Sequence, residues 1–129
     1  MRILFESIAN APNVNSNEFI DIQGLSFHLP NEIIWQRRTL ITLNVPRPYA
    51  KGNNFPGLDF AITVDGVVKA EGGFTYPMKQ PESFARVPFT LVLSVDLGKE
   101  PKKVHAQWKS VRGSVGYIDS FASLSAVVD

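Results

Sequence analysis

The sequence predicts an all-β domain, and two patterns lead to this prediction. Apolar and polar residues alternate with period two in several windows, whereas no window keeps an apolar stripe at helical spacing over three turns. Turn residues recur between these windows, as they do between the short strands of antiparallel proteins. The chain has 129 residues, of which 44% are hydrophobic. We therefore expect a single domain, residues 1–129, that buries its own core.

The N-terminal part predicts strands separated by turn clusters. Residues 10–17 are of types that hydrogen-bond their own backbone in turns. Gly24 is expected to mark a bulge or bend within the second strand. Farther on, alternate residues from Thr39 to Val45 share one face. The expected strands are Ile3–Ile8, Glu18–Asp21 continued by Leu25–Leu29, and Ile33–Trp35 leading into Thr39–Val45.

The segment Pro46–Gly57 contains three prolines and two glycines, yet it keeps Tyr49 and Phe55. The prolines and glycines predict a fixed, turn-rich loop without regular structure. Strands on both sides would present this loop rigidly, which is the common arrangement at recognition sites. A structural Ω-loop packed by its own side chains is the alternative.

The C-terminal part predicts further strands around a second irregular segment. Asp65-Gly66 between two strand-like runs indicates a hairpin, and Gly72-Gly73 is expected to interrupt the returning strand. Phe89–Leu97 alternates most regularly and is interpreted as a core strand. The small residues of the last strand suit a central position. The expected strands are Leu58–Val64, Val67–Tyr76, Phe89–Leu97, Lys102–Val111 and Tyr117–Val128, with Pro77–Pro88 irregular between them.

These strands favour a sandwich of two antiparallel sheets, most simply a jelly roll. An immunoglobulin-like sandwich is the structural alternative, although the chain does not resemble the Cys and Trp core signature of that fold.

The composition excludes several classes of partner and site. A formal net charge of +1 does not supply the basic field that nucleic acids need, so no nucleic-acid partner is expected. Cysteine is absent, which excludes disulfides and thiolate metal sites. Neither a signal peptide nor a long apolar stretch is recognisable. We expect no membrane insertion, and a protein that is cytoplasmic or leaves the cell by a non-classical route.

The sequence shows no motif typical of catalysis or of metal binding. His28 and His105 fall in different strand segments and are interpreted as ordinary surface or packing residues. The run Arg112–Gly116 lacks the first glycine of the nucleophile-elbow motif, and no helix is predicted after it. We expect no enzyme activity, no metal and no cofactor, which leaves a hydrolase as the weakest functional alternative.

What remains is a binding surface rich in planar and hydrogen-bonding groups. A sugar offers an apolar face that packs on an aromatic ring, and adjacent hydroxyls that a guanidinium meets with two donors. The alternative is that Arg86 and Arg112 pair with carboxylates such as Glu82 and Asp119. The candidate residues are Tyr49, Thr75, Tyr76, Ser83, Arg86 and Arg112.

Long and uncommon stretches run through most of the chain, namely Leu43–Gly57, Gly73–Tyr76, Pro81–Ser83, Arg86–Thr90, Gln107–Ser114 and Ile118–Ala126. They resemble the N-terminal, tumour-necrosis-factor-like lectin domain of a Burkholderia superlectin. This resemblance implies a TNF-like or C1q-like jelly-roll protomer that assembles into a homotrimer. It also implies that fucose and fucosylated oligosaccharides of the blood-group type bind in pockets between neighbouring protomers.

The resemblance implies sugar contacts for the six candidate residues, from opposite sides of an interface between protomers. The expected groups are Tyr49, Ser83 and Arg86 on one side, and Thr75, Tyr76 and Arg112 on the other. Two positions depart from the family pattern, because Asp59 replaces a tyrosine and Phe84 replaces a threonine, and both are expected to alter specificity. The superlectin's second, calcium-dependent lectin domain is not expected here. The alternative function is a trimeric jelly-roll structural or adhesion module whose sugar pocket these two residues have closed.

Overall fold

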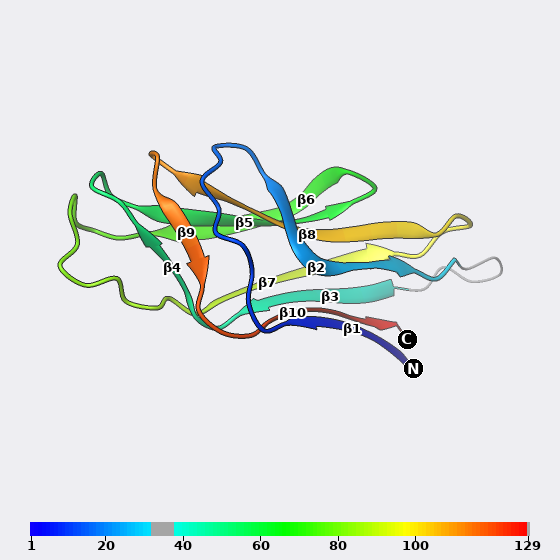
Figure 1. Ribbon diagram of the computed structural model, residues 1–129. Helices are drawn as coiled ribbons and strands as arrows, with labels where there is room; N and C mark the ends of the chain where they lie inside the picture. The colour runs from blue at the N-terminus through cyan, green and yellow to red at the C-terminus, as the bar shows by residue number, and fades with distance from the viewer. Residues whose placement is uncertain (32–37, 129) are drawn as a thin grey trace.

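The computed structural model describes residues 1–31 and 38–128. Within these ranges the chain forms ten β-strands and no helix (Figure 1). The expected segment Ile33–Trp35 lies outside the described residues. The strands are β1 (Arg2–Ile8), β2 (Ile20–Leu29), β3 (Arg38–Val45), β4 (Pro48–Lys51), β5 (Gly57–Val64), β6 (Val67–Thr75), β7 (Phe89–Asp96), β8 (Lys102–Val111), β9 (Val115–Ile118) and β10 (Ala122–Val128).

Two four-stranded antiparallel sheets form the layers of a sandwich (Figure 1). One sheet has the order β1-β10-β3-β7 and the other has the order β2-β8-β5-β6. The chain changes sheet at most connections, as in a jelly roll. A separate two-stranded ribbon of β4 and β9 lies toward one end of the sandwich (Figure 1). The predicted all-β sandwich of two antiparallel sheets is therefore confirmed.

The core lies between the two sheets, because alternate residues of the facing strands point inward. Phe60 of β5 stacks on Phe89 of β7 with ring centroids 4.8 Å apart, and on Trp108 of β8 with centroids 6.3 Å apart. Phe60 and Trp108 are at most 2% exposed. Burial of such large rings supplies much of the hydrophobic stabilisation that holds the two layers together.

Backbone dihedral angles confirm two turn predictions. Asp65 and Gly66 have φ angles of 51° and 80°, which suits the type I′ turn of a two-residue hairpin. Gly24 has a φ angle of 91°, and the β2–β8 register shifts between Asp21 and Ser26. Gly24 thus lies in an irregular part of β2, as expected.

Two predictions about strand boundaries are wrong. The segment Pro46–Gly57 was expected to lack regular structure but contains β4. Pro48 does not prevent this strand, because it is the first residue, where a missing N–H is tolerated. The expected strand Tyr117–Val128 is two strands, β9 and β10, separated by residues 119–121. The chain changes partners at this break, because β9 pairs with β4 whereas β10 pairs with β1 and β3.

A further prediction about strand context is wrong, since Gly72-Gly73 does not interrupt β6. Pairing of β5 and β6 continues through Gly72 and Gly73, and the register shifts instead between Ile62 and Thr63. A Cβ atom at Gly73 would collide with the Leu58 carbonyl oxygen, so glycine permits close approach there and does not interrupt the strand. β7 contributes to the core as expected, since its inner face from Phe89 to Val95 packs against the buried cluster, although β7 lies at the edge of its sheet. Alternation reports which face is buried, not where the strand lies in its sheet.

Gly116 allows the β4–β9 ribbon to pack on the sandwich. Its N–H donates to the Val14 carbonyl at 2.7 Å and its carbonyl accepts from the Val14 N–H at 3.0 Å. A Cβ atom at Gly116 would overlap the Leu58 side chain and would lie 2.8 Å from Val14 Cγ1. Only glycine therefore fits between β9, the N-terminal segment and β5.

We predict that Gly116→Ala destabilises the protein by about 1–3 kcal/mol, because the added methyl group overpacks a closed site. Urea denaturation at fixed protein concentration measures this change in the free energy of unfolding. Gly98→Ala is the matched control, since its Cβ atom would meet only Lys102 side-chain atoms at 3.8 and 4.0 Å. Equal unfolding midpoints for the two variants would contradict the assigned role of Gly116.

Candidate functional site

The β4–β9 ribbon presents two tyrosines on its outer face. Tyr49 and Tyr117 are directly paired across the ribbon, and their rings stack with centroids 4.7 Å apart and an interplanar angle of 10°. Their neighbours Pro48, Ala50 and Gly116 are buried, so the alternation of the strands directs the two rings outward. The β4–β9 ribbon, which the sequence did not predict, thus forms the aromatic floor of the candidate site.

Arg86 lies over the Tyr49 ring, with Cζ 3.8 Å from the ring centroid. This is a cation–π contact, in which the aromatic ring attracts the guanidinium electrostatically. Tyr49 itself is only partly exposed, and Tyr117 and Arg86 both lie against its ring. The Tyr49 ring thus contacts Arg86 and Tyr117, which leaves less of its surface open to a ligand.

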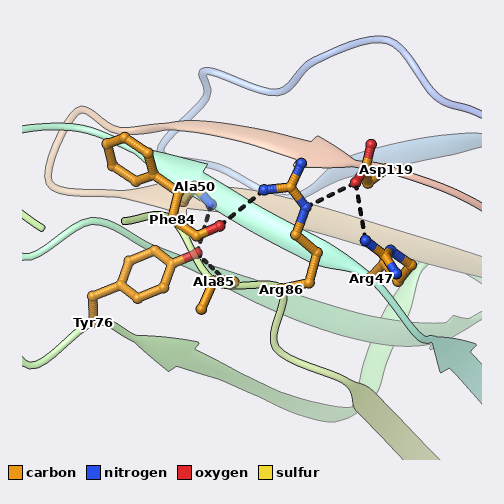
Figure 2. Close-up of polar contacts among 7 residues, drawn as sticks. All are labelled: Arg47, Ala50, Tyr76, Phe84, Ala85, Arg86 and Asp119. Atoms are coloured by element: carbon orange, nitrogen blue, oxygen red, sulfur yellow. Dashed lines mark hydrogen bonds and ion pairs between the residues drawn. The ribbon is translucent and has the colours of Figure 1, made fainter. Parts of the chain in front are cut away.

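Asp119 fixes the guanidinium from a second direction, as Figure 2 shows. Arg86 Nε donates to Asp119 Oδ2 at 2.8 Å, and Arg86 Nη1 donates to the Phe84 carbonyl at 2.9 Å. Arg47 Nη2 lies 3.7 Å from the same carboxylate oxygen. Among the described residues, Arg86 Nη2 has no hydrogen-bond acceptor, and in Figure 2 this nitrogen points away from the residues drawn. One edge of an otherwise fixed guanidinium is thus available to a ligand.

The ion pair changes the titration of both partners in the expected directions. The hydrogen bond to Arg86 lowers the pKa of Asp119 below its usual value of 3.8. The same hydrogen bond raises the pKa of Arg86. Arg86 and Asp119 are therefore both charged throughout the neutral and weakly acidic range.

Tyr76 ties the irregular segment 77–88 to β4. Its hydroxyl donates to the Ala85 carbonyl at 2.6 Å and accepts from the Ala50 N–H at 3.4 Å (Figure 2). The side chain is buried, and this burial raises the pKa of Tyr76. Phe84 packs edge-on against Tyr76 with ring centroids 6.3 Å apart. Tyr76 and Phe84 therefore shape the backbone that carries Arg86.

Lys51 adds a second cation to this cluster. Its Nζ atom lies 5.5 Å from the Tyr117 ring centroid, 5.9 Å from that of Phe84 and 6.0 Å from that of Tyr49. These distances are near the outer limit for a cation–π contact. Lys51 thus contributes positive potential beside Arg86.

Arg112 forms a separate anchor at the turn between β8 and β9. Its Nε donates to the carbonyls of Asn54 and Phe55, both at 3.0 Å, and its Nη2 donates to Phe55 at 2.6 Å. Arg112 and Phe55 both have positive φ angles, 50° and 48°. Such a conformation is costly for these residues, and the hydrogen bonds between them compensate for part of the cost. Arg112 therefore holds the end of the segment 46–57.

The remaining sequence-predicted residues lie around Gly57. Thr75 pairs with Gly57 from β6, whereas Val111, next to Arg112, pairs with Gly57 from β8. Asp59 lies two residues farther along β5, between Gly73 and Lys109. Thr75 is exposed and Asp59 is partly exposed. Thr75, Asp59 and Arg112 thus lie around one end of the β2-β8-β5-β6 sheet.

The structure brings some of the sequence-predicted residues together within the chain and separates others. Tyr76 contacts the segment that carries Arg86, whereas Thr75 and Arg112 lie near Gly57. Ser83 is exposed and precedes Phe84. The expected carboxylate partner is found for Arg86 in Asp119, while Arg112 binds carbonyls. The sequence did not assign Tyr117 or Lys51 to the site. The β4–β9 pairing places Tyr117 beside Tyr49, and Lys51 shares a face with Tyr49 because residues 48–51 form a strand.

The arrangement offers hydrogen-bond donors and aromatic edges, which is recognition chemistry. No group of three or more His, Cys, Asp or Glu side chains is placed to hold a metal ion in residues 1–31 and 38–128. His105 Nδ1 lies 3.5 Å from Asp21 Oδ2, away from this cluster. In the same residue ranges, no helix has the length and apolar character needed to cross a bilayer.

Comparisons with known proteins place the fold and the family. No curated protein sequence matches the chain. A crystal structure of dimeric latent PorU from Porphyromonas gingivalis is similar over 96% of this chain, with 8% sequence identity and a TM-score of 0.51. The chain spans only 12% of that PorU chain, so the likeness concerns the fold alone. Residues 9–127 match the family described as Bc2l-C, N-terminal domain. The chain therefore belongs to the Bc2l-C N-terminal domain family, a lectin-type family of carbohydrate-binding domains.

Proposed function

We propose that this protein is a non-enzymatic lectin that binds fucose and fucosylated oligosaccharides of the blood-group type. The observation that carries the proposal is the Arg86 guanidinium, which Asp119 and Tyr49 hold in place while its Nη2 atom has no acceptor among the described residues and, in Figure 2, points away from the residues drawn. Vicinal hydroxyls of a sugar match the spacing of guanidinium donors. A donor that is already fixed loses little conformational entropy on binding.

Hydrogen bonding, more than ring stacking, is the proposed basis of recognition. Arg86 and Tyr117 already contact the Tyr49 ring, so this residue contributes mainly by orienting Arg86. Arg112 is fixed by the segment 46–57 in the same manner, with Nε and Nη2 bound to carbonyls. Two preordered guanidinium groups would thus define the sugar pocket.

The two departures from the family pattern affect different parts of the proposed site. Phe84 packs on Tyr76 and lies below Lys51, so it adds apolar surface beside Arg86. Asp59 lies near Thr75 and Arg112, where its carboxylate accepts hydroxyl hydrogen bonds but offers no ring. We propose that both residues alter the preferred glycan without removing the pocket.

The outer face of the β1-β10-β3-β7 sheet supports the proposed homotrimer. Cross-strand pairing puts Ile3, Val127 and Leu40 in one row, with exposed fractions of 61%, 39% and 48%. Phe5 and Val92 lie in the next row and are 61% and 54% exposed. Exposed apolar residues that gather on one face mark protein–protein contacts. Copies of the same chain are the proposed partners, and pockets between them would combine Arg86 of one protomer with Arg112 of its neighbour.

A trimeric structural or adhesion module without a sugar pocket is the second candidate. One observation favours it, since Tyr76 and Arg86 already use polar groups within the protomer and Phe84 fills space beside them. Both candidates predict a trimer, so a measurement of mass does not separate them. A glycan array does, because only the lectin candidate predicts binding to fucosylated glycans. Binding to no fucosylated glycan would reject the lectin proposal.

We predict that Arg86→Lys lowers the affinity for methyl α-L-fucoside about tenfold or more, measured by calorimetry. A lysine cannot hold Asp119 and present a planar pair of donors at the same time. Arg38→Lys is the matched control, because Arg38 Nε also lies near a carboxylate, 3.3 Å from Asp96 Oδ1. Arg38 is the first residue of β3, at the end of that strand remote from β4. Unchanged affinity in Arg86→Lys would exclude the role proposed for the guanidinium.

We predict that the contribution of the Arg86–Asp119 pair to fucose affinity is constant from neutral pH down through the usual carboxyl range and falls only at lower pH. Because the pKa of Asp119 is lowered from 3.8, its interaction with Arg86 is fully present above that value and is lost as pH falls through the folded-state pKa. Asp119→Asn should weaken binding at pH 7 and remove this acid-dependent decline. Asp96→Asn should do neither, and the same decline in Asp119→Asn would contradict the assignment.

We predict that Leu40→Asp converts the trimer to monomers, because it places a charge in the centre of the apolar outer face. Sedimentation equilibrium measures the change in mass. Val67→Asp on β6 is the control, since Val67 is 54% exposed but lies on the other sheet. A Leu40→Asp protein that remains trimeric would show that this face is not the interface.

A further inference from the structure

A groove lined by uncharged residues lies beside the turn between β8 and β9. It has a volume of about 430 Å³, within the range of roughly 300–1,000 Å³ that is usual for small-molecule sites. Its lining residues are Asn15, Ser16, Asn17, Ser110 and Gly113. None of them is charged, and four carry an amide or a hydroxyl.

Backbone hydrogen bonds fix one wall of the groove at two points. Val14 exchanges two backbone hydrogen bonds with Gly116 of β9. Ser110 of β8 donates to the Ser16 carbonyl through its N–H at 2.9 Å and through its hydroxyl at 3.3 Å. Asn15 lies between these two attachments. The wall is therefore preordered, so a ligand would not have to order it.

The polar groups that face the groove are suited to an uncharged polyhydroxyl ligand. The Asn15 and Asn17 side chains are exposed, and neither amide is hydrogen-bonded to the described part of the chain. An amide both donates and accepts, as does a sugar hydroxyl. The Ser110 hydroxyl donates to Ser16 and keeps lone pairs that can accept. A lining without charged side chains offers no ion pair to an acidic or basic ligand.

The position of the groove connects it to the proposed glycan site. The turn between β8 and β9 carries Arg112, which contacts Asn54 and Phe55, and also Gly113, which lines the groove. One short turn thus borders both places. A branched oligosaccharide held at Arg112 could reach the groove with a neighbouring sugar unit.

We propose that the groove is an extension subsite that binds a neutral sugar unit of the fucosylated oligosaccharide, next to the fucose itself. This inference rests on the proposed lectin function. It assigns to the groove the part of the ligand that Arg86 and Arg112 do not hold. The subsite distinguishes extended neutral glycans from free fucose.

Two variants test the subsite by different means. The double variant Asn15→Ala and Asn17→Ala removes both amides. Gly113→Asn fills the groove, because a Cβ atom at Gly113 meets nothing within 4 Å and Asn tolerates a φ angle of +71° better than other side chains do. Gly66→Asn is the matched control, since Gly66 also has a positive φ, +80°, and open space. It lies in the β5–β6 hairpin, at the end of β5 remote from Arg112.

Calorimetry with methyl α-L-fucoside and with a neutral blood-group tetrasaccharide gives the result. We expect both groove variants to lose roughly three- to tenfold in tetrasaccharide affinity, the effect of one or two hydrogen bonds, with fucoside affinity unchanged. Gly66→Asn should match the unmodified protein for both ligands. Unchanged tetrasaccharide affinity in both groove variants, with fucoside still bound, overturns the subsite alone. Failure of the unmodified protein to bind either ligand overturns the lectin proposal and the subsite together.

Discussion

The close packing of β9 at Gly116 is the constraint on which the candidate site depends. Leu58 and Val14 leave no room for a side chain at this position, so the β9 backbone lies directly on the sandwich. β4 pairs with β9 there, and their register brings Tyr49 opposite Tyr117. The aromatic pair then supports Arg86. The requirement for glycine at position 116 thus determines where the charged and aromatic groups of the site can lie.

The Arg86–Asp119 ion pair has two consequences that act in opposite directions. It occupies Nε, which removes one donor from a ligand, but it also fixes the guanidinium with Nη2 directed outward. Surface ion pairs usually contribute little to stability because solvent screens them. Its importance here is therefore geometric. A carboxylate, a carbonyl and an aromatic ring together define the direction in which the free edge of Arg86 points.

The two arginines of the proposed site depend on different parts of the chain. Arg86 is held by Asp119 and by the Phe84 carbonyl, whereas Arg112 is held by the far end of the segment 46–57. This division fits the proposed pocket between two protomers, to which each would contribute one fixed guanidinium. It also gives the segment 46–57 two roles: its first half supplies Tyr49, and its second half orders Arg112.

The all-β class, most strand positions, the Asp65-Gly66 hairpin and the family could be predicted from the sequence, because these follow from local alternation, turn chemistry and long characteristic stretches. The sequence also named Asp119 as a possible partner of Arg86. Contacts in the folded chain were needed to show that β4 forms within a proline-rich segment, that Tyr117 stacks on Tyr49, and that Arg112 binds carbonyls. Each of these depends on pairing between segments far apart in the chain, and periodicity within a segment carries no information about its partner.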